Sequence, residues 1–98
     1  MGFGSLFKKD ETETRNELLR KGLKFLDSGK NEKAMECFDK AIELEPEFVD
    51  AWLNKGYTLH HLGKREESIV CIRKVLELDP NNELALTNIK AFGYEEYF

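Results

Sequence analysis

The sequence predicts an all-α protein on three observations. Apolar residues recur at intervals of three and four, which is the spacing of one face of a helix, and do not alternate as in a strand. Only two prolines interrupt the 98 residues, and a unit of 34 residues occurs twice in tandem. The apolar content of 41% is sufficient for one packed domain, and the length leaves no room for a second.

The repeat appears when residues 15–48 are laid on residues 49–82. The two units agree at eleven positions, where about two would agree by chance, so the period is real. The identical pairs are Leu19/Leu53, Lys21/Lys55, Gly22/Gly56, Gly29/Gly63, Lys30/Lys64, Glu32/Glu66, Cys37/Cys71, Lys40/Lys74, Glu43/Glu77, Leu44/Leu78 and Pro46/Pro80.

Each unit contains the pattern of two helices. In the first unit, Thr14 and Glu17 have the spacing of a capping box, which predicts a helix from about residue 14 to residue 28. Gly29 can adopt the left-handed conformation that ends it, and a second amphipathic pattern predicts a helix over residues 31–44. The second unit repeats this order, with Gly63 at the turn.

Proline and glycine each recur at equivalent positions of the two units, and these positions require an explanation. Pro46 and Pro80 are each expected to begin the following helix, where the missing N–H does no harm. Gly22 and Gly56 fall in the middle of helices, where glycine costs about 1 kcal/mol relative to alanine. We therefore expect the partner helix to approach closely at both glycines, with the small Ala34 and Ser68 opposite.

At these residues the pattern resembles the tetratricopeptide repeat, in which a large residue, a glycine, an aromatic, a small residue, a large apolar residue and a late proline follow at fixed spacing. The first unit matches at Leu18, Gly22, Phe25, Ala34, Phe38, Ala41 and Pro46, and the second at Trp52, Gly56, Leu59, Ser68, Ile72, Val75 and Pro80. Leu59 replaces the usual aromatic, and Lys21 and Lys55 stand where leucine is most common. The resemblance implies a right-handed α–α superhelix of about five helices.

A third unit begins at residue 83 and is not completed. Lys90 stands where Gly56 stood in the second unit, which suits a terminal helix without a following partner. We therefore divide the chain into a flexible arm (1–13), a repeat domain (14–92) and a tail (93–98). The repeat domain consists of repeat 1 (15–48), repeat 2 (49–82) and a capping helix (83–92), which is near the lower limit for a stable solenoid.

The resemblance also implies a binding groove, because the first helices of such repeats line a concave surface that holds a peptide. Here these helices carry a second stripe that includes Asn16, Asp27, Asp50, His61, Leu84 and Ala91. The predicted groove residues on this stripe are Leu19, Arg20, Leu23, Leu26, Leu53, Asn54, Tyr57, His60, Thr87 and Asn88. Apolar members would grip apolar side chains, and the polar ones would bond a peptide backbone. The alternative is that the leucines are covered by the N-terminal arm, the tail or a second copy of the chain.

Composition argues against several other functions. The net charge of −4 and the lack of a basic stripe disfavour nucleic acid, and no apolar run is long enough to span a membrane. Cys37 and Cys71 have no metal or redox spacing and are expected to be buried free thiols. His60 and His61 are adjacent on a helix and cannot chelate one metal by the usual spacing, and no nucleophile or phosphate-loop motif occurs. We expect no enzyme activity, metal or cofactor, and a cytoplasmic location.

The two ends of the chain leave alternatives open. The tail 94–98 carries Tyr94, Tyr97 and Phe98, which either cover the end of the last helix, the simpler arrangement, or fill a groove of the same or a neighbouring chain. The first nine residues place apolar side chains beside Lys8 and Lys9; a disordered arm is favoured over weak membrane contact.

Two functions are consistent with the repeat and its apolar stripe. The first is an adaptor that binds a protein or peptide partner in the groove, and the alternative is a self-assembly module that forms a homodimer. In the homodimer, either the apolar stripe or the terminal faces of the array would bind the second copy. The apolar groove and the incomplete third unit are consistent with both functions, so the sequence does not separate them.

Overall fold

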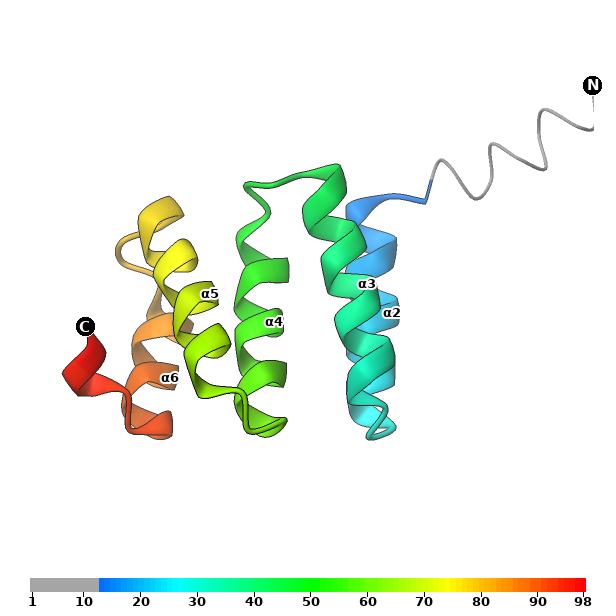
Figure 1. Ribbon diagram of the computed structural model, residues 1–98. Helices are drawn as coiled ribbons and strands as arrows, with labels where there is room; N and C mark the ends of the chain where they lie inside the picture. The colour runs from blue at the N-terminus through cyan, green and yellow to red at the C-terminus, as the bar shows by residue number, and fades with distance from the viewer. Residues whose placement is uncertain (1–12) are drawn as a thin grey trace, which may run out of the picture.

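The computed structural model describes residues 13–98, which contain five α-helices and no strand. The helices are α2 (Arg15–Asp27), α3 (Asn31–Leu44), α4 (Val49–His61), α5 (Arg65–Leu78) and α6 (Glu83–Phe92), followed by the 3₁₀ helix η1 (Glu95–Tyr97). Consecutive helices run antiparallel, α4 lies between the α2–α3 pair and α5, and the tail packs beyond α5 and α6 (Figure 1). The predicted all-α helical-repeat fold is confirmed, as are the bounds of the first two helices.

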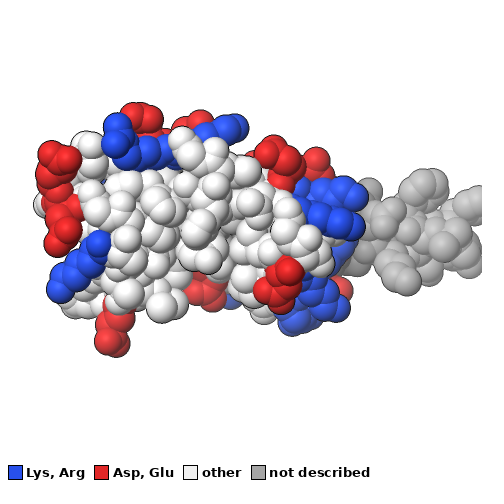
Figure 2. Space-filling view, turned by 90° about the horizontal axis from the view of Figure 1, so that it is seen from below, with Lys and Arg blue, Asp and Glu red and all other residues white. Residues whose placement is uncertain are grey.

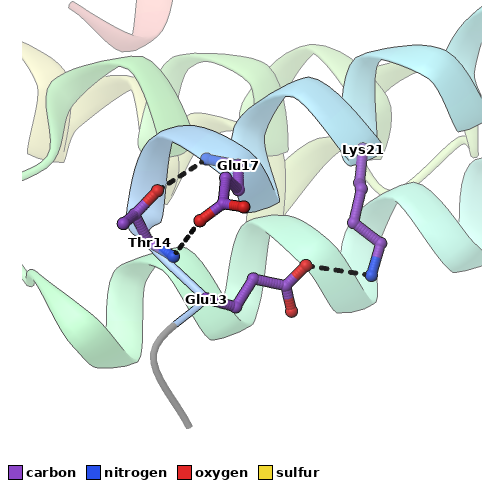
Figure 3. A network of polar contacts seen from close by, with 4 residues as sticks. All are labelled: Glu13, Thr14, Glu17 and Lys21. Carbon is purple, nitrogen blue, oxygen red and sulfur yellow. Dashed lines mark hydrogen bonds and ion pairs between the residues drawn. The ribbon is translucent and has the colours of Figure 1, made fainter. Parts of the chain in front are cut away.

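The start of α2 has the capping box that the sequence predicts. The Thr14 hydroxyl accepts a hydrogen bond from the Glu17 amide at 3.1 Å, and the Glu17 carboxylate accepts one from the Thr14 amide at 3.0 Å (Figure 3). These hydrogen bonds hold the pKa of the Glu17 carboxyl below its usual value. Lys21, one turn further along, pairs with Glu13 at 3.0 Å. Of the expected flexible arm (1–13), only Glu13 belongs to the described residues.

The helical pairs are closed by glycine turns. Gly29, Gly63 and Gly93 have φ of 75°, 79° and 74°, which is the left-handed conformation that favours glycine. After each glycine the next amide donates to a carbonyl five residues back, from Lys30 to Phe25 and from Lys64 to Leu59. Gly93 comes four residues before the position equivalent to Gly63, so α6 has 10 residues where α4 has 13.

The two prolines lie in turns and do not begin helices, so that prediction is wrong. Both α4 and α6 begin three residues after their proline, with Phe48 and Asn82 as the capping residues. The Asn82 side chain accepts a hydrogen bond from the Ala85 amide at 2.9 Å and so caps the amino end of α6. The Pro46 carbonyl accepts a hydrogen bond from the Trp52 indole at 2.7 Å, so the turn is tied to α4.

Within each pair the helices approach closely at the mid-helix glycine, as predicted. A Cβ on Gly22 would collide with the Phe38 ring, which fills this space instead of the smaller Ala34. A Cβ on Gly56 would lie 3.2 Å from Cys71 Cβ, and the Ser68 hydroxyl donates a 2.7 Å hydrogen bond to the Gly56 carbonyl. Side chains at these two positions would therefore force the helices apart.

Two buried clusters join the pairs into one array. The inter-repeat cluster contains Leu18, Ala41, Phe48 and Ala51, and the C-terminal cluster contains Leu53, Ile69, Ile72, Val75, Ala85, Ile89 and Tyr94. An ion pair of 2.6 Å between Lys55 and Asp39 also links α4 to α3. The first helices of the repeats, α2 and α4, are thereby held side by side, and their shared surface forms the candidate site.

Candidate functional site

A pocket of about 450 Å³ lies between α2 and α4. Its size falls within the range of about 300–1,000 Å³ that is usual for ligand sites. The α2–α4 pocket is lined by Leu23, Leu26, Asp27, Asn31, Asn54, Tyr57, Thr58 and His61.

The repeat places unlike residues at equivalent positions across this pocket. Leu23 of α2 is equivalent to Tyr57 of α4, and Asp27 is equivalent to His61. Leu23 is 38% exposed and Tyr57 is 41% exposed, so both present apolar area to a ligand. The α2 wall is therefore aliphatic with one carboxylate, and the α4 wall is aromatic.

The polar groups on the α4 wall are held by their own helix. The Asn54 side-chain amide donates to the Asp50 carbonyl at 2.8 Å, and the buried Thr58 hydroxyl donates to the Asn54 carbonyl at 2.7 Å. Within residues 13–98 the Asn54 side-chain oxygen has no bond of its own. It can accept a hydrogen bond from a ligand without a change of side-chain conformation.

An aromatic cluster extends the α4 wall towards α6. The rings of Tyr57 and His61 lie 4.4 Å apart, and His60 stacks on Phe92 at 3.8 Å. The Nδ1 atom of His60 lies 2.7 Å from the Tyr94 hydroxyl. Burial, and then the neighbouring His61, lower the pKa of His60 below its usual value, which favours the neutral ring.

The surface around the site carries little charge. Figure 2 views the molecule from the end at which α2, α4 and α6 finish in Figure 1. Its middle is a broad area without acidic or basic side chains, and Lys, Arg, Asp and Glu lie around the edge. A partner on this face would bury mainly uncharged surface.

The structure brings together four of the ten predicted groove residues. Leu23, Leu26, Asn54 and Tyr57 line the α2–α4 pocket, and His60 lies beside it in the aromatic cluster.

The other five predicted groove residues lie elsewhere. Leu53 is 6% exposed in the C-terminal cluster and offers almost no surface to a ligand, because α6 packs over it. Leu19 is half-buried against the inter-repeat cluster. Arg20 lines a shallow hollow with Glu13, Glu17, Lys21 and Lys24. On α6, Thr87 is exposed and Asn88 half-buried, and neither lines the pocket.

Asp27 and His61 also line the pocket; they lie on the predicted stripe but are not among the ten groove residues. Three further residues of the site lie outside that stripe. Asn31 is the first residue of α3 and reaches the pocket because the Gly29 turn places it beside the end of α2. Thr58 follows Asn54 by one helical turn, a spacing that could have indicated it. Phe92 likewise follows Asn88 by four residues, yet its contact with His60 depends on how α6 packs.

The C-terminal tail covers the end of the array and does not line the α2–α4 pocket. Tyr94 is 2% exposed within the C-terminal cluster, and Arg73 donates a 2.8 Å hydrogen bond to the Tyr97 carbonyl. This arrangement agrees with the first of the two alternatives for the tail. Phe98 remains 47% exposed and borders a second, shallower hollow of about 540 Å³ with Trp52 and Val70.

The part of the chain that the structure describes gives little support to a metal site, a membrane span or a reactive thiol. There, no group of three His, Cys, Asp or Glu side chains is placed to hold a metal ion. None of the helices in residues 13–98 has the length and hydropathy needed to cross a bilayer. Cys37 and Cys71 are buried free thiols, and burial raises the pKa of Cys71 to about 11, so this thiol is protonated at neutral pH.

Antiparallel helix pairs that repeat every 34 residues define a helical-repeat protein. Two family models match the chain: one described as TPR repeat over residues 22–63, and one described as tetratricopeptide repeat over residues 49–82. The chain belongs to the tetratricopeptide-repeat family. Repeats of this family are generally protein–protein interaction modules, and its members are typically non-enzymatic scaffolds.

One curated relative is an uncharacterized protein of Methanocaldococcus jannaschii. It is 51% identical to this chain over 35 residues, which is 36% of the chain and 41% of the relative. The match therefore spans about two fifths of the length of that relative and supports the repeat itself.

Proposed function

We propose that this protein is a scaffold that binds a polypeptide segment of a partner in the α2–α4 pocket. The pocket itself carries the proposal, because it combines exposed apolar walls with a few fixed polar groups, which is the usual composition of a peptide-binding site. Leu23 and Tyr57 would contact apolar side chains of the segment, and Asn54 would accept a hydrogen bond from its backbone. The predicted residues Thr87 and Asn88 would extend the groove onto α6.

The proposal includes that the protein is not an enzyme and that it acts in the cytoplasm. The two thiols are buried, and the ring of His60 is already engaged by Tyr94 and Phe92. These groups are therefore poorly placed to act on a substrate.

A second candidate is self-assembly into a homodimer. Leu84 and Leu86 of α6 are 63% and 45% exposed, and Val70 and Phe98 add apolar surface at the same end of the array. A second copy could cover this C-terminal surface without entering the α2–α4 pocket.

One experiment separates the two candidates. Light scattering across a concentration series gives the solution mass, and NMR spectra of the ¹⁵N-labelled protein with peptides selected from a random library locate the bound segment. A monomer whose Asn54 and Tyr57 amide signals shift with peptide supports the scaffold. The opposite result is a dimer that selects no peptide and whose mass falls to that of a monomer when Leu84 and Leu86 are changed to serine. That result would replace the scaffold with self-assembly as the proposed function.

A further inference from the structure

We propose that the α2–α4 pocket receives a basic side chain of the bound segment, arginine in preference to lysine, with Asp27 as its counter-charge. This inference rests on the proposed function and adds the chemistry of the residue that the pocket selects.

The charge inventory of the pocket is the first argument. Of its eight lining residues, Asp27 alone is acidic, and none is lysine or arginine. Within residues 13–98 Asp27 takes part in no ion pair and no hydrogen bond of its side chain. A carboxylate without a partner, at the edge of a pocket that contains no lysine or arginine, favours a cationic group in the ligand.

The position of Asp27 in its helix is the second argument. It is the last residue of α2, where the negative end of the helix dipole disfavours a carboxylate. The amino end of α3 is close in sequence, but the Asp27 side chain makes no hydrogen bond to it. Its counterpart in the second repeat is His61, a residue type that suits a helix end. Local helix stability therefore does not account for an acid at this position.

The walls of the pocket fit the rest of such a side chain. Leu23 and Leu26 provide an aliphatic surface on which the methylene stem can lie. Tyr57 presents an exposed ring on the opposite wall, and aromatic faces attract cations. Arginine is preferred because a planar guanidinium can stack on a ring and also donate two parallel hydrogen bonds to a carboxylate. The chain's net charge of −4 adds a long-range attraction for a basic partner.

Selection from a random peptide library tests the inference on the full chain. The wild type should select peptides with arginine or lysine at one fixed position beside apolar residues. The Asp27→Asn variant should keep the apolar preference and lose the basic one, and Asp27→Lys should select an acidic residue at the same position. The matched control is Asp50→Asn, which removes an exposed carboxylate of α4 that does not line the pocket.

A selected peptide then gives a quantitative test. Replacing its basic residue with glutamine should weaken binding to the wild type about tenfold, and to Asp27→Asn less than about twofold. Pocket-binding peptides without a basic preference, or an equal loss in both proteins, would overturn this inference and leave the scaffold in place. If no peptide is selected, the proposed function fails and the inference fails with it.

Discussion

Asp27 and His61 occupy equivalent positions of the two repeats, 34 residues apart, and both line the pocket between α2 and α4. The repeat thus brings one acid and one imidazole to a single pocket although each ends its own helix. Identical repeats would have placed two like groups there. The differences between the units, more than their shared residues, give the site its chemistry.

Changing Leu23 to serine should weaken peptide binding without unfolding the protein. Leu23 is 38% exposed, so the change should lower the free energy of unfolding by only about 1–2 kcal/mol, a part of what a fully buried leucine contributes. The dissociation constant of a library-selected peptide, measured by fluorescence anisotropy, should rise about tenfold. Leu44→Ser is the matched control, since Leu44 is an exposed helical leucine outside the pocket. Equal effects of the two changes would count against the pocket as the binding site.

Changing Gly22 to alanine should destabilise the fold. The added methyl group would collide with the Phe38 ring, which is fully buried and has little room to move. Overpacking of this kind costs about 1–3 kcal/mol, and a gain in helix propensity of up to about 1 kcal/mol offsets part of it. Gly56→Ala should cost less, because its Cβ would meet Cys71 Cβ at 3.2 Å. Urea denaturation measures both, and a Gly22→Ala protein more stable than the wild type would contradict the packing.

Changing Thr14 to alanine should lower stability by about 1 kcal/mol, because it removes the side-chain half of the capping box. Thr14→Ser keeps a hydroxyl at the cap and serves as the control. Thermal unfolding followed by circular dichroism measures both variants, and an unchanged midpoint in Thr14→Ala would show that the cap contributes nothing.

Much of the fold could be predicted because each helix carries its own local signals. Thr14 and Glu17 indicate where α2 starts, and Gly29 and Gly63 indicate where the first helices end. The start of α6 also has a local signal, because Asn82 is a preferred capping residue that follows the proline. The start of α4 has none, because its capping residue Phe48 makes no side-chain hydrogen bond and is instead buried in the inter-repeat cluster.

The site could be predicted less well, because membership of a stripe does not determine exposure. Leu53 and Tyr57 lie one turn apart on the same stripe, yet α6 buries Leu53 and leaves Tyr57 41% exposed. The contact of His60 with Tyr94 joins residues 34 apart and depends on α6 ending at Gly93, one turn early. No pattern within a single helix indicates such contacts.

Changing Tyr94 to phenylalanine should lower stability by about 1 kcal/mol, because it removes the hydroxyl that bonds His60 Nδ1 in a part-buried environment. The ring itself stays in the C-terminal cluster, so packing is kept. Tyr97→Phe is the matched control, because the Tyr97 contact with Arg73 uses a backbone carbonyl and not the hydroxyl. Equal losses in the two variants, measured by urea denaturation, would argue against the His60 bond.

The stability of the protein should fall as the pH is lowered past about 6.5, and part of this fall should depend on His60. Its pKa lies below 6.5 in the folded chain, because burial and the neighbouring His61 disfavour the charged ring. As the pH falls, the unfolded chain therefore takes up this proton before the folded chain does. The contribution of His60 to the free energy of unfolding is therefore complete above the pKa of the unfolded chain. It decreases as the pH falls to the pKa of the folded chain and is constant below that value. Urea denaturation between pH 8 and pH 5 measures the free energy of unfolding. With falling pH this free energy should decrease less in His60→Gln than in the wild type, and His61→Gln should retain most of the wild-type decrease. Parallel profiles for the wild type and His60→Gln would show that the contact with Phe92 and Tyr94 places no penalty on the charged ring.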